Sequence, residues 1–118
     1  MDEQLTLRSV CAHKASYEDP LAGRAGDELE VGPADVEWAE WRWCTAADGR
    51  RGWVPEALLE GAGARRRLAR DYDARELTVR AGELLVVLET ESGWARCRTR
   101  DGREGWLPGG CVKSAAGK

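Results

Sequence analysis

Apolar and polar residues alternate over short stretches of this chain, and turn-forming residues separate the stretches. Between Asp27 and Val31, the side chains of Leu29 and Val31 fall on one side and those of Glu28 and Glu30 on the other. Such alternation places residues on the two faces of a β-strand. The longer apolar period of an amphipathic helix is absent. The pattern predicts an all-β protein with short strands at 27–31, 41–45, 51–54, 84–87, 94–99 and 104–107.

The connections between these strands carry their own signals. Asp48-Gly49 and Asp101-Gly102 each follow a Trp-led strand, and an Asp-Gly pair favours a tight hairpin because glycine accepts a positive φ. Pro55 and Pro108 should end their strands, since proline cannot donate a ladder hydrogen bond. The apolar residues that follow each proline predict one tight helical turn and a last short strand.

One sequence pattern occurs twice. Residues 41–59 read WRWCTAADGRRGWVPEALL and residues 94–112 read WARCRTRDGREGWLPGGCV, and the two align without a gap. A period of about fifty residues indicates a duplicated structural unit. The connection Gly61-Ala62-Gly63-Ala64 is short, so we expect the two copies to pack as one rigid body.

Composition narrows the function. The 118 residues include 18 basic and 21 acidic side chains, for a net charge of -3, which argues against nucleic acid as a partner. The run Arg65-Arg66-Arg67 is interpreted as a solvated join between the copies. No apolar stretch reaches the length of a membrane span, and the first residues lack the pattern of a signal peptide. We expect a cytoplasmic protein with no membrane partner.

The four cysteines are interpreted as unpaired and free of metal. They form no C-x-x-C pair, the local spacing that zinc sites usually show, and a reducing cytoplasm keeps thiols reduced. Cys44 and Cys97 occupy equivalent places in the two copies, so we expect them to be small buried residues of matching strands. Cys11 and Cys111 complete the set.

Nothing in the sequence indicates catalysis. His13 is the only histidine, and we expect it to face solvent or to make a satisfied hydrogen bond, because catalysis needs partners that the sequence does not indicate. Nucleophile, paired-carboxylate, phosphate-loop and metal-helix motifs are absent. The prediction is that the protein is not an enzyme and uses no cofactor and no metal.

The repeated motifs resemble the Src-homology-3 family, and most of all its tandem, variant members from bacteria. The matching residues are a Gly-acid strand start, a Trp-led strand and a Gly-aromatic-aliphatic-Pro closing motif: Gly26-Asp27-Glu28-Leu29, Gly82-Glu83-Leu84-Leu85, Trp41, Trp94, Gly52-Trp53-Val54-Pro55 and Gly105-Trp106-Leu107-Pro108. The resemblance implies two small Src-homology-3-like β-barrels in tandem, packed on each other. The implied ranges are a first barrel at 1–60, a linker at 61–67, and a second barrel with a short tail at 68–118.

The family binds proline-rich peptides in a shallow aromatic groove, which suits a preformed polyproline helix. By resemblance, Tyr17, Trp41 and Pro55 form the better groove, with Trp43 as a possible extension. Tyr72, Trp94 and Pro108 form the weaker one. The closing tyrosine of the family is missing, because Leu58 and Cys111 stand at its two places.

These residues predict a non-catalytic module that binds a protein or peptide. The acids of the first loops, Glu18, Asp19, Asp71, Asp73 and Glu76, favour a ligand that carries Arg or Lys. Three alternatives stay open: cell-wall (peptidoglycan) binding, which requires export; nucleic-acid binding through Arg65 to Arg70 and aromatic stacking; and a structural tandem whose grooves are occluded. The rings of Trp43 and its neighbours serve either a ligand or the packing of the two domains.

Overall fold

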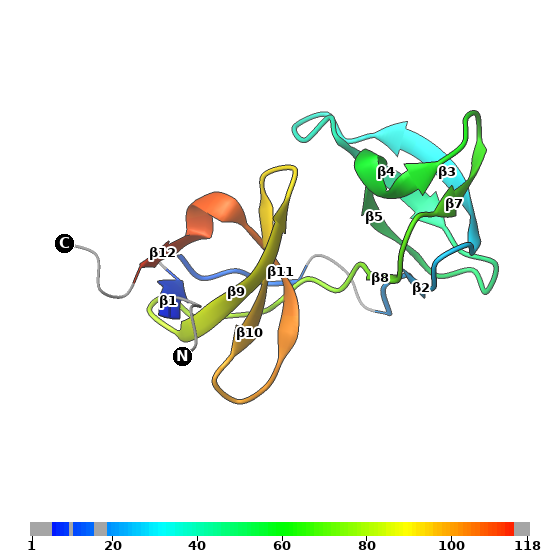
Figure 1. Ribbon diagram of the computed structural model, residues 1–118. Coiled ribbons are helices and arrows are strands. Elements are labelled where there is room, and N and C mark those ends of the chain that lie inside the picture. Colours follow the sequence, from blue (N-terminus) through cyan, green and yellow to red (C-terminus); the bar gives the residue numbers. More distant parts are fainter. Residues whose placement is uncertain (1–5, 10, 16–18, 115–118) are drawn as a thin grey trace. The chain divides into compact units, whose positions relative to one another are not determined.

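The computed structural model describes residues 6–9, 11–15 and 19–114 and is all-β, as the alternating pattern predicts (Figure 1). The six predicted strands are present as β3 (Glu28–Ala34), β4 (Trp41–Thr45), β5 (Arg51–Pro55), β9 (Leu84–Glu91), β10 (Trp94–Thr99) and β11 (Glu104–Pro108). Short strands complete the set: β1 (Thr6–Ser9), β2 (Ala22–Gly23), β6 (Leu59–Glu60), β7 (Arg65–Leu68), β8 (Tyr72–Asp73) and β12 (Val112–Ser114). The tight turns after the two prolines are the 3-10 turns η1 (Glu56–Leu58) and η2 (Gly109–Cys111).

The residues gather into two compact units that do not follow the two sequence copies. The terminal unit contains residues 1–16 and 76–118, and the central unit contains residues 17–75. The terminal unit holds a five-stranded sheet in the order β11-β10-β9-β1-β12. The central unit holds an equivalent sheet in the order β5-β4-β3-β7-β6, and β2 pairs with β8 beside it.

The first strands of the two copies are exchanged. Strand β1 pairs with β9 through Leu7↔Leu85 and with β12 through Ser9↔Val112, so the first copy completes the sheet of the second (Figure 1). Strand β7, which consists of the last residues of the expected linker and Leu68 of the second copy, pairs with β3 through Leu29↔Arg66 and with β6 through Leu59↔Leu68. The chain that leads into the second copy thus completes the sheet of the first. The compact units therefore differ from the contiguous barrels that the repeat predicts.

A local hairpin accounts for this exchange. Strands β6 and β7 are joined only by the connection from Gly61 to Ala64, and they pair antiparallel. Gly61 and Gly63 have φ values of +103° and +84°, which glycine adopts without the steric cost that a Cβ brings. Connections this short join adjacent antiparallel strands. The hairpin places β7 beside β6, in the position that the first strand of the first copy would otherwise take.

Each unit has its own apolar core. In the terminal unit the core is the buried cluster of Leu77, Val79, Leu85, Ala95, Cys97 and Leu107. In the central unit Leu21, Leu29, Val54 and the exchanged Leu68 are at most 2% exposed. The absence of a side chain at Gly23 makes room for Leu68, because a Cβ at Gly23 would lie 2.8 Å from Leu68 Cδ1. Leu68 is thus fitted to the unit that receives it.

The expectation that all four cysteines are unpaired is wrong for two of them. Cys11 and Cys111 form a disulfide with a Cα–Cα distance of 5.4 Å. Sequence spacing did not indicate it, because the partners are 100 residues apart and the exchange of β1 brings them together. Cys44 and Cys97 are free and fully buried, as their equivalent repeat positions predict.

We predict that Leu68→Ala destabilises the central unit, although Leu68 belongs to the second copy. Removing a buried leucine side chain costs about 2–5 kcal/mol. Amide hydrogen exchange should show the larger loss of protection in β3 and β4. Val36→Ala is the control, because Val36 is fully exposed and its truncation should change stability by less than about 0.5 kcal/mol. A larger loss in β9 and β10 would contradict the exchange.

Candidate functional site

The most open cluster of predicted site residues lies in the terminal unit. Trp94 and Pro108 face each other as cross-strand partners of β10 and β11, and both are half-buried. Side chains at directly opposed positions share one face of a sheet. The His13 ring meets the Trp94 ring edge-on, with centroids 5.9 Å apart and an interplanar angle of 81°. We call His13, Trp94 and Pro108 the terminal aromatic face.

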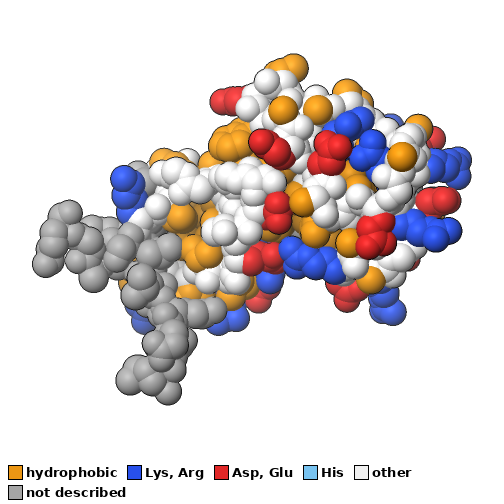
Figure 2. All heavy atoms as spheres, turned by 45° about the horizontal axis from the view of Figure 1, so that its top comes forward, with side chains coloured by type: hydrophobic (Ala, Val, Ile, Leu, Met, Phe, Trp, Pro, Cys, Tyr) orange, Lys and Arg blue, Asp and Glu red, His pale blue; other side chains and the backbone are white. Residues whose placement is uncertain are grey.

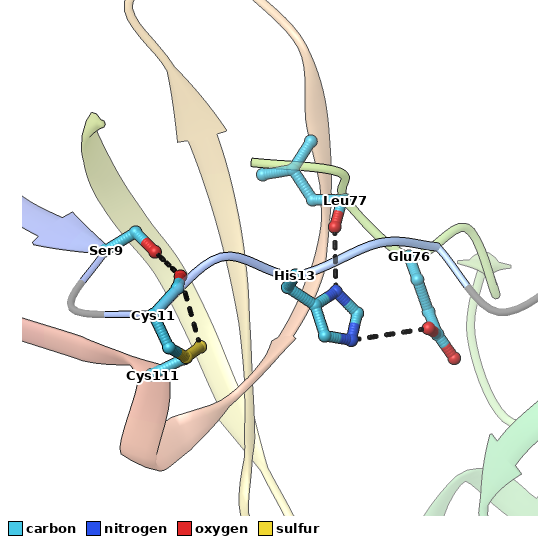
Figure 3. Close-up of a disulfide and its surroundings, with 6 residues drawn as sticks. All are labelled: Ser9, Cys11, His13, Glu76, Leu77 and Cys111. Atoms are coloured by element: carbon cyan, nitrogen blue, oxygen red, sulfur yellow. Dashed lines mark hydrogen bonds and ion pairs between the residues drawn. A yellow bond between two sulfur atoms is a disulfide. The ribbon is translucent and has the colours of Figure 1, made fainter. Parts of the chain in front are cut away.

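His13 is held firmly in this position (Figure 3). Its backbone exchanges two hydrogen bonds with Val79, of 2.9 and 2.8 Å. Its ring Nδ1 lies 2.9 Å from the Leu77 carbonyl oxygen, and its Nε2 lies 3.7 Å from Glu76 Oε1. Both neighbours of the ring are oxygen atoms that can accept a hydrogen bond from a ring N–H. The expectation of a satisfied hydrogen bond at His13 is confirmed.

Acidic side chains border the terminal aromatic face. Glu91 is the cross-strand partner of Trp94 on β9, and its Oε2 accepts a hydrogen bond of 2.7 Å from the Ser92 hydroxyl. Glu76 is the second acid, with a side chain 7% exposed beside His13. Glu89, on the same strand as Glu91, is bound to Arg96 by a contact of 2.6 Å. Of these three, Glu91 and Glu76 stand next to the rings themselves.

The equivalent residues of the central unit are covered. Trp41 is 4% exposed, and its cross-strand partner Pro55 is fully buried. Tyr72 is also buried, and its hydroxyl donates a 2.6 Å hydrogen bond to the Trp53 carbonyl. Because β7 and β8 belong to the central unit, Tyr72 lies with Trp41 and Pro55, whereas the sequence placed it with Trp94 and Pro108. Tyr17 falls outside the described residues.

A second aromatic pair stands on β4 and β5 of the central unit. Trp43 and Trp53 are cross-strand partners whose ring centroids are 4.9 Å apart at an interplanar angle of 63°. Both rings are half-buried. Their backbone positions alternate with those of the buried Cys44 and Val54, so the pair lies on the sheet face opposite the core, as the alternation predicts for Trp43.

Sequence reasoning missed His13 as a member of an aromatic face. His13 is the fourth residue after Ser9, as Tyr72 is the fourth after Leu68, and both pair with matching backbone positions. His13 therefore takes in the terminal unit the place that Tyr72 takes in the central unit. The equal spacing from Ser9 to His13 and from Leu68 to Tyr72 is present in the sequence. It can be recognised only once β1 is known to be equivalent to β7.

Lys and Arg side chains are interspersed with Asp and Glu side chains over the face shown in Figure 2. Arg65 of the basic run lies 3.5 Å from Glu28, and Arg66 lies 3.5 Å from Glu56. Over the part of the chain that the structure describes, no three His, Cys, Asp or Glu side chains gather in a metal-binding arrangement.

One hollow of about 450 Å³ lies in the central unit, and its described lining contains none of the predicted site residues. Its walls come from β2, β3, β7 and the β4–β5 turn, and include Asp27, Glu28, Glu30, Thr45 and Arg65. Charged groups of this hollow already have partners within the protein. Glu28 pairs with Arg65, and Asp27 accepts a hydrogen bond of 2.9 Å from the Arg24 backbone N–H.

The fold and the aromatic residues define a tandem of small β-barrels of the Src-homology-3 kind, a class whose members are generally non-catalytic binding modules. The family model for the variant SH3 domain matches residues 7–61 and again residues 67–114, so the chain belongs to the variant SH3 domain family. Comparison with curated proteins gives no match. Among the described residues, no helix has the length and apolar character needed to cross a bilayer.

We predict that only two thiols can be alkylated in the unfolded, unreduced protein, and four after reduction, because Cys11 and Cys111 are bonded. In the native protein Cys44 and Cys97 should react slowly at pH 8. Burial raises the pKa of both thiols to about 11, and the thiolate is the reactive form. Their native alkylation rate should keep rising toward pH 11. A rate that levels off near pH 9, as in the unfolded control, would contradict this.

Proposed function

We propose that this protein is a non-catalytic module that binds an extended segment of another protein on the terminal aromatic face. The observation that carries the proposal is a difference in exposure. Trp94 and Pro108 are half-exposed, whereas Trp41 and Pro55 of the central unit are covered. A tryptophan ring and a proline ring side by side offer a flat apolar surface, and His13 adds a third ring at its edge.

The chemistry of this face suits an extended proline-containing segment. Such a segment has few conformations to lose on binding, and its rings pack against aromatic side chains without requiring buried hydrogen bonds. Glu91, beside Trp94, and Glu76, beside His13, favour a ligand with Arg or Lys next to the proline, because a carboxylate attracts a nearby cation. The partner class that we propose is therefore a basic, proline-containing peptide segment.

This proposal moves the main site from the copy that the sequence favoured. Sequence reasoning assigned the stronger groove to Tyr17, Trp41 and Pro55, with Trp43 as an extension. The covered state of Trp41 and Pro55 supports the terminal unit in its place. Tyr17, Tyr72 and Trp43 stay proposed contributors to a second site in the central unit, and the Trp43–Trp53 pair is its most open feature.

A cell-wall ligand is a second candidate, and one observation favours it. The Cys11–Cys111 disulfide is of a kind that persists mainly in oxidising compartments outside the cytoplasm. This weakens the reason for expecting reduced cysteines, and the cytoplasmic location remains a sequence-based prediction. Sedimentation of the protein with purified peptidoglycan tests this candidate, and a bound fraction that Trp94→Ala abolishes would favour it over the peptide.

We predict that Trp94→Ala weakens binding of a peptide rich in proline and arginine by about thirtyfold. An aromatic residue at the centre of a binding face often contributes about 2 kcal/mol. A fluorescence or calorimetric titration measures the change. Circular dichroism checks that the variant is folded, because Trp94 also contacts His13.

Trp43→Ala is the matched control, since Trp43 is also a half-buried strand tryptophan but lies on the central unit. Because Trp43 belongs to the proposed second site, its loss should change the affinity of the terminal aromatic face less than twofold. A larger loss for Trp43→Ala than for Trp94→Ala would move the site to the Trp43–Trp53 pair. Absence of binding by any member of a proline- and arginine-rich peptide library would reject the peptide proposal.

We predict that affinity for the same peptide falls as salt rises, and that Glu91→Gln removes part of this dependence. Salt screens exposed charges over about 10 Å at 0.1 M, and one exposed ion pair contributes up to about 1 kcal/mol. The variant should bind roughly two- to fivefold more weakly at low salt. Glu37→Gln, an exposed acid of the central unit, should leave the titration unchanged. Equal salt slopes for wild type and Glu91→Gln would exclude this role for Glu91.

A further inference from the structure

The two exchanged strands are held in different ways. Strand β7 is continuous with the β6–β7 hairpin on one side and leads into β8 of the same central unit on the other. Among the described residues, no short connection joins β1 to β9 or β12, and the chain leaves the terminal unit soon after β1. Strand β1 is held by its ladders with these two strands and by the contacts of the residues that follow it.

The apolar anchoring of the two strands also differs. Leu68, at the end of β7, is 1% exposed in the core of the central unit. Ser9 is the equivalent residue of β1. Its backbone N–H donates to the backbone carbonyl of Glu83, as the Leu68 N–H donates to that of Asp27, and each of these acids follows a turn glycine. Ser9 is equally buried, but a serine removes far less apolar surface from water than a leucine does. At this equivalent position the terminal unit thus buries a serine where the central unit buries a leucine.

The disulfide lies close to this buried serine. Cys11 follows Ser9 by two residues, and Cys111 directly precedes β12, whose Val112 pairs with Ser9. Figure 3 shows the disulfide beside Ser9, whose hydroxyl donates to the Cys11 carbonyl. In the central unit the place of Cys111 is taken by Leu58, which is buried beside the β6–β7 hairpin. A covalent bond therefore stands where the central unit relies on leucines.

We propose that the Cys11–Cys111 disulfide is a redox latch on the exchanged strand: reduction releases residues 6–15 from the terminal unit and leaves the rest of that unit folded. The released segment carries His13 away from Trp94. If the terminal aromatic face is the binding site, the latch also controls binding, and this consequence rests on the proposed function. The equivalent ladder between β7 and β3 has no cysteine and does not respond.

The chemistry needs only a dithiol reductant. Cys11 is exposed and Cys111 is buried, so a thiolate of the reductant attacks Cys11 Sγ and Cys111 leaves as a thiolate that takes up a proton. The second thiol of the reductant, as a thiolate, then attacks the reductant's first sulfur, which is bonded to Cys11 Sγ in the mixed disulfide. This step releases Cys11, which is protonated in turn. Two electrons pass to the protein, which gains two hydrogens, and the reductant becomes a cyclic disulfide.

The test is amide hydrogen exchange followed by mass spectrometry on the full chain, oxidised and after treatment with dithiothreitol. We expect reduction to lower protection at least tenfold in residues 6–9, 84–86 and 112–114, where β1 meets β9 and β12. Residues 28–30 and 65–67, which form the equivalent ladder of the central unit, should keep their protection and serve as the internal reference. No ligand is involved, so this result is independent of the proposed function.

Two variants complete the experiment. The double variant Cys11→Ser with Cys111→Ser should show the reduced pattern without reductant and should not respond to it. Cys97→Ala keeps the disulfide and should respond as wild type does. Four titratable thiols in the unreduced protein, or equal protection of β1 in both redox states, would overturn the latch. Loss of protection that spreads through β10 and β11 would also overturn it, and would make the disulfide a general staple of the terminal unit.

Discussion

The structure depends on one constraint, the short glycine-containing connection between β6 and β7. A connection from Gly61 to Ala64 lets the chain turn back on itself but not travel to another sheet. Local pairing across a tight turn loses little chain entropy, whereas pairing over a long loop must first close that loop. Strand β7 therefore pairs with β6 and β3, and β1 is left to pair with β9 and β12.

Because of the exchange, each aromatic face contains residues from both sequence copies. His13 joins Trp94 and Pro108, and Tyr72 joins the unit of Trp41 and Pro55. A substitution in the first strand of one copy therefore alters the unit that is formed mainly by the other copy. Leu68 and Gly23 show the same fit across copies, because a Cβ at Gly23 would lie only 2.8 Å from Leu68 Cδ1, so that one of the two would have to shift.

The two units reach similar folds with different stabilising contacts. The central unit uses buried leucines at positions 58 and 68. The terminal unit has Cys111 and Ser9 at the equivalent places, and Cys111 forms a disulfide with Cys11. Hydrophobic burial is permanent under ordinary conditions, whereas a disulfide depends on the redox state of its surroundings. In the duplicated fold, the exchanged strand of the central unit thus ends in a buried leucine, and the exchanged strand of the terminal unit is followed by a covalent link.

The sequence by itself determined the all-β class, the strand positions, the turns and the family, because these depend on alternation, Asp-Gly turns and ordered motifs within about fifty residues. It also placed Cys44 and Cys97 in the cores. Only the tertiary structure decided which first strand serves which sheet, the Cys11–Cys111 pairing, the place of His13 and the cover over Trp41. These features join residues far apart in the chain. Sequence periodicity reports which face of a strand is buried, but it carries no information on which of two similar sheets will receive that strand.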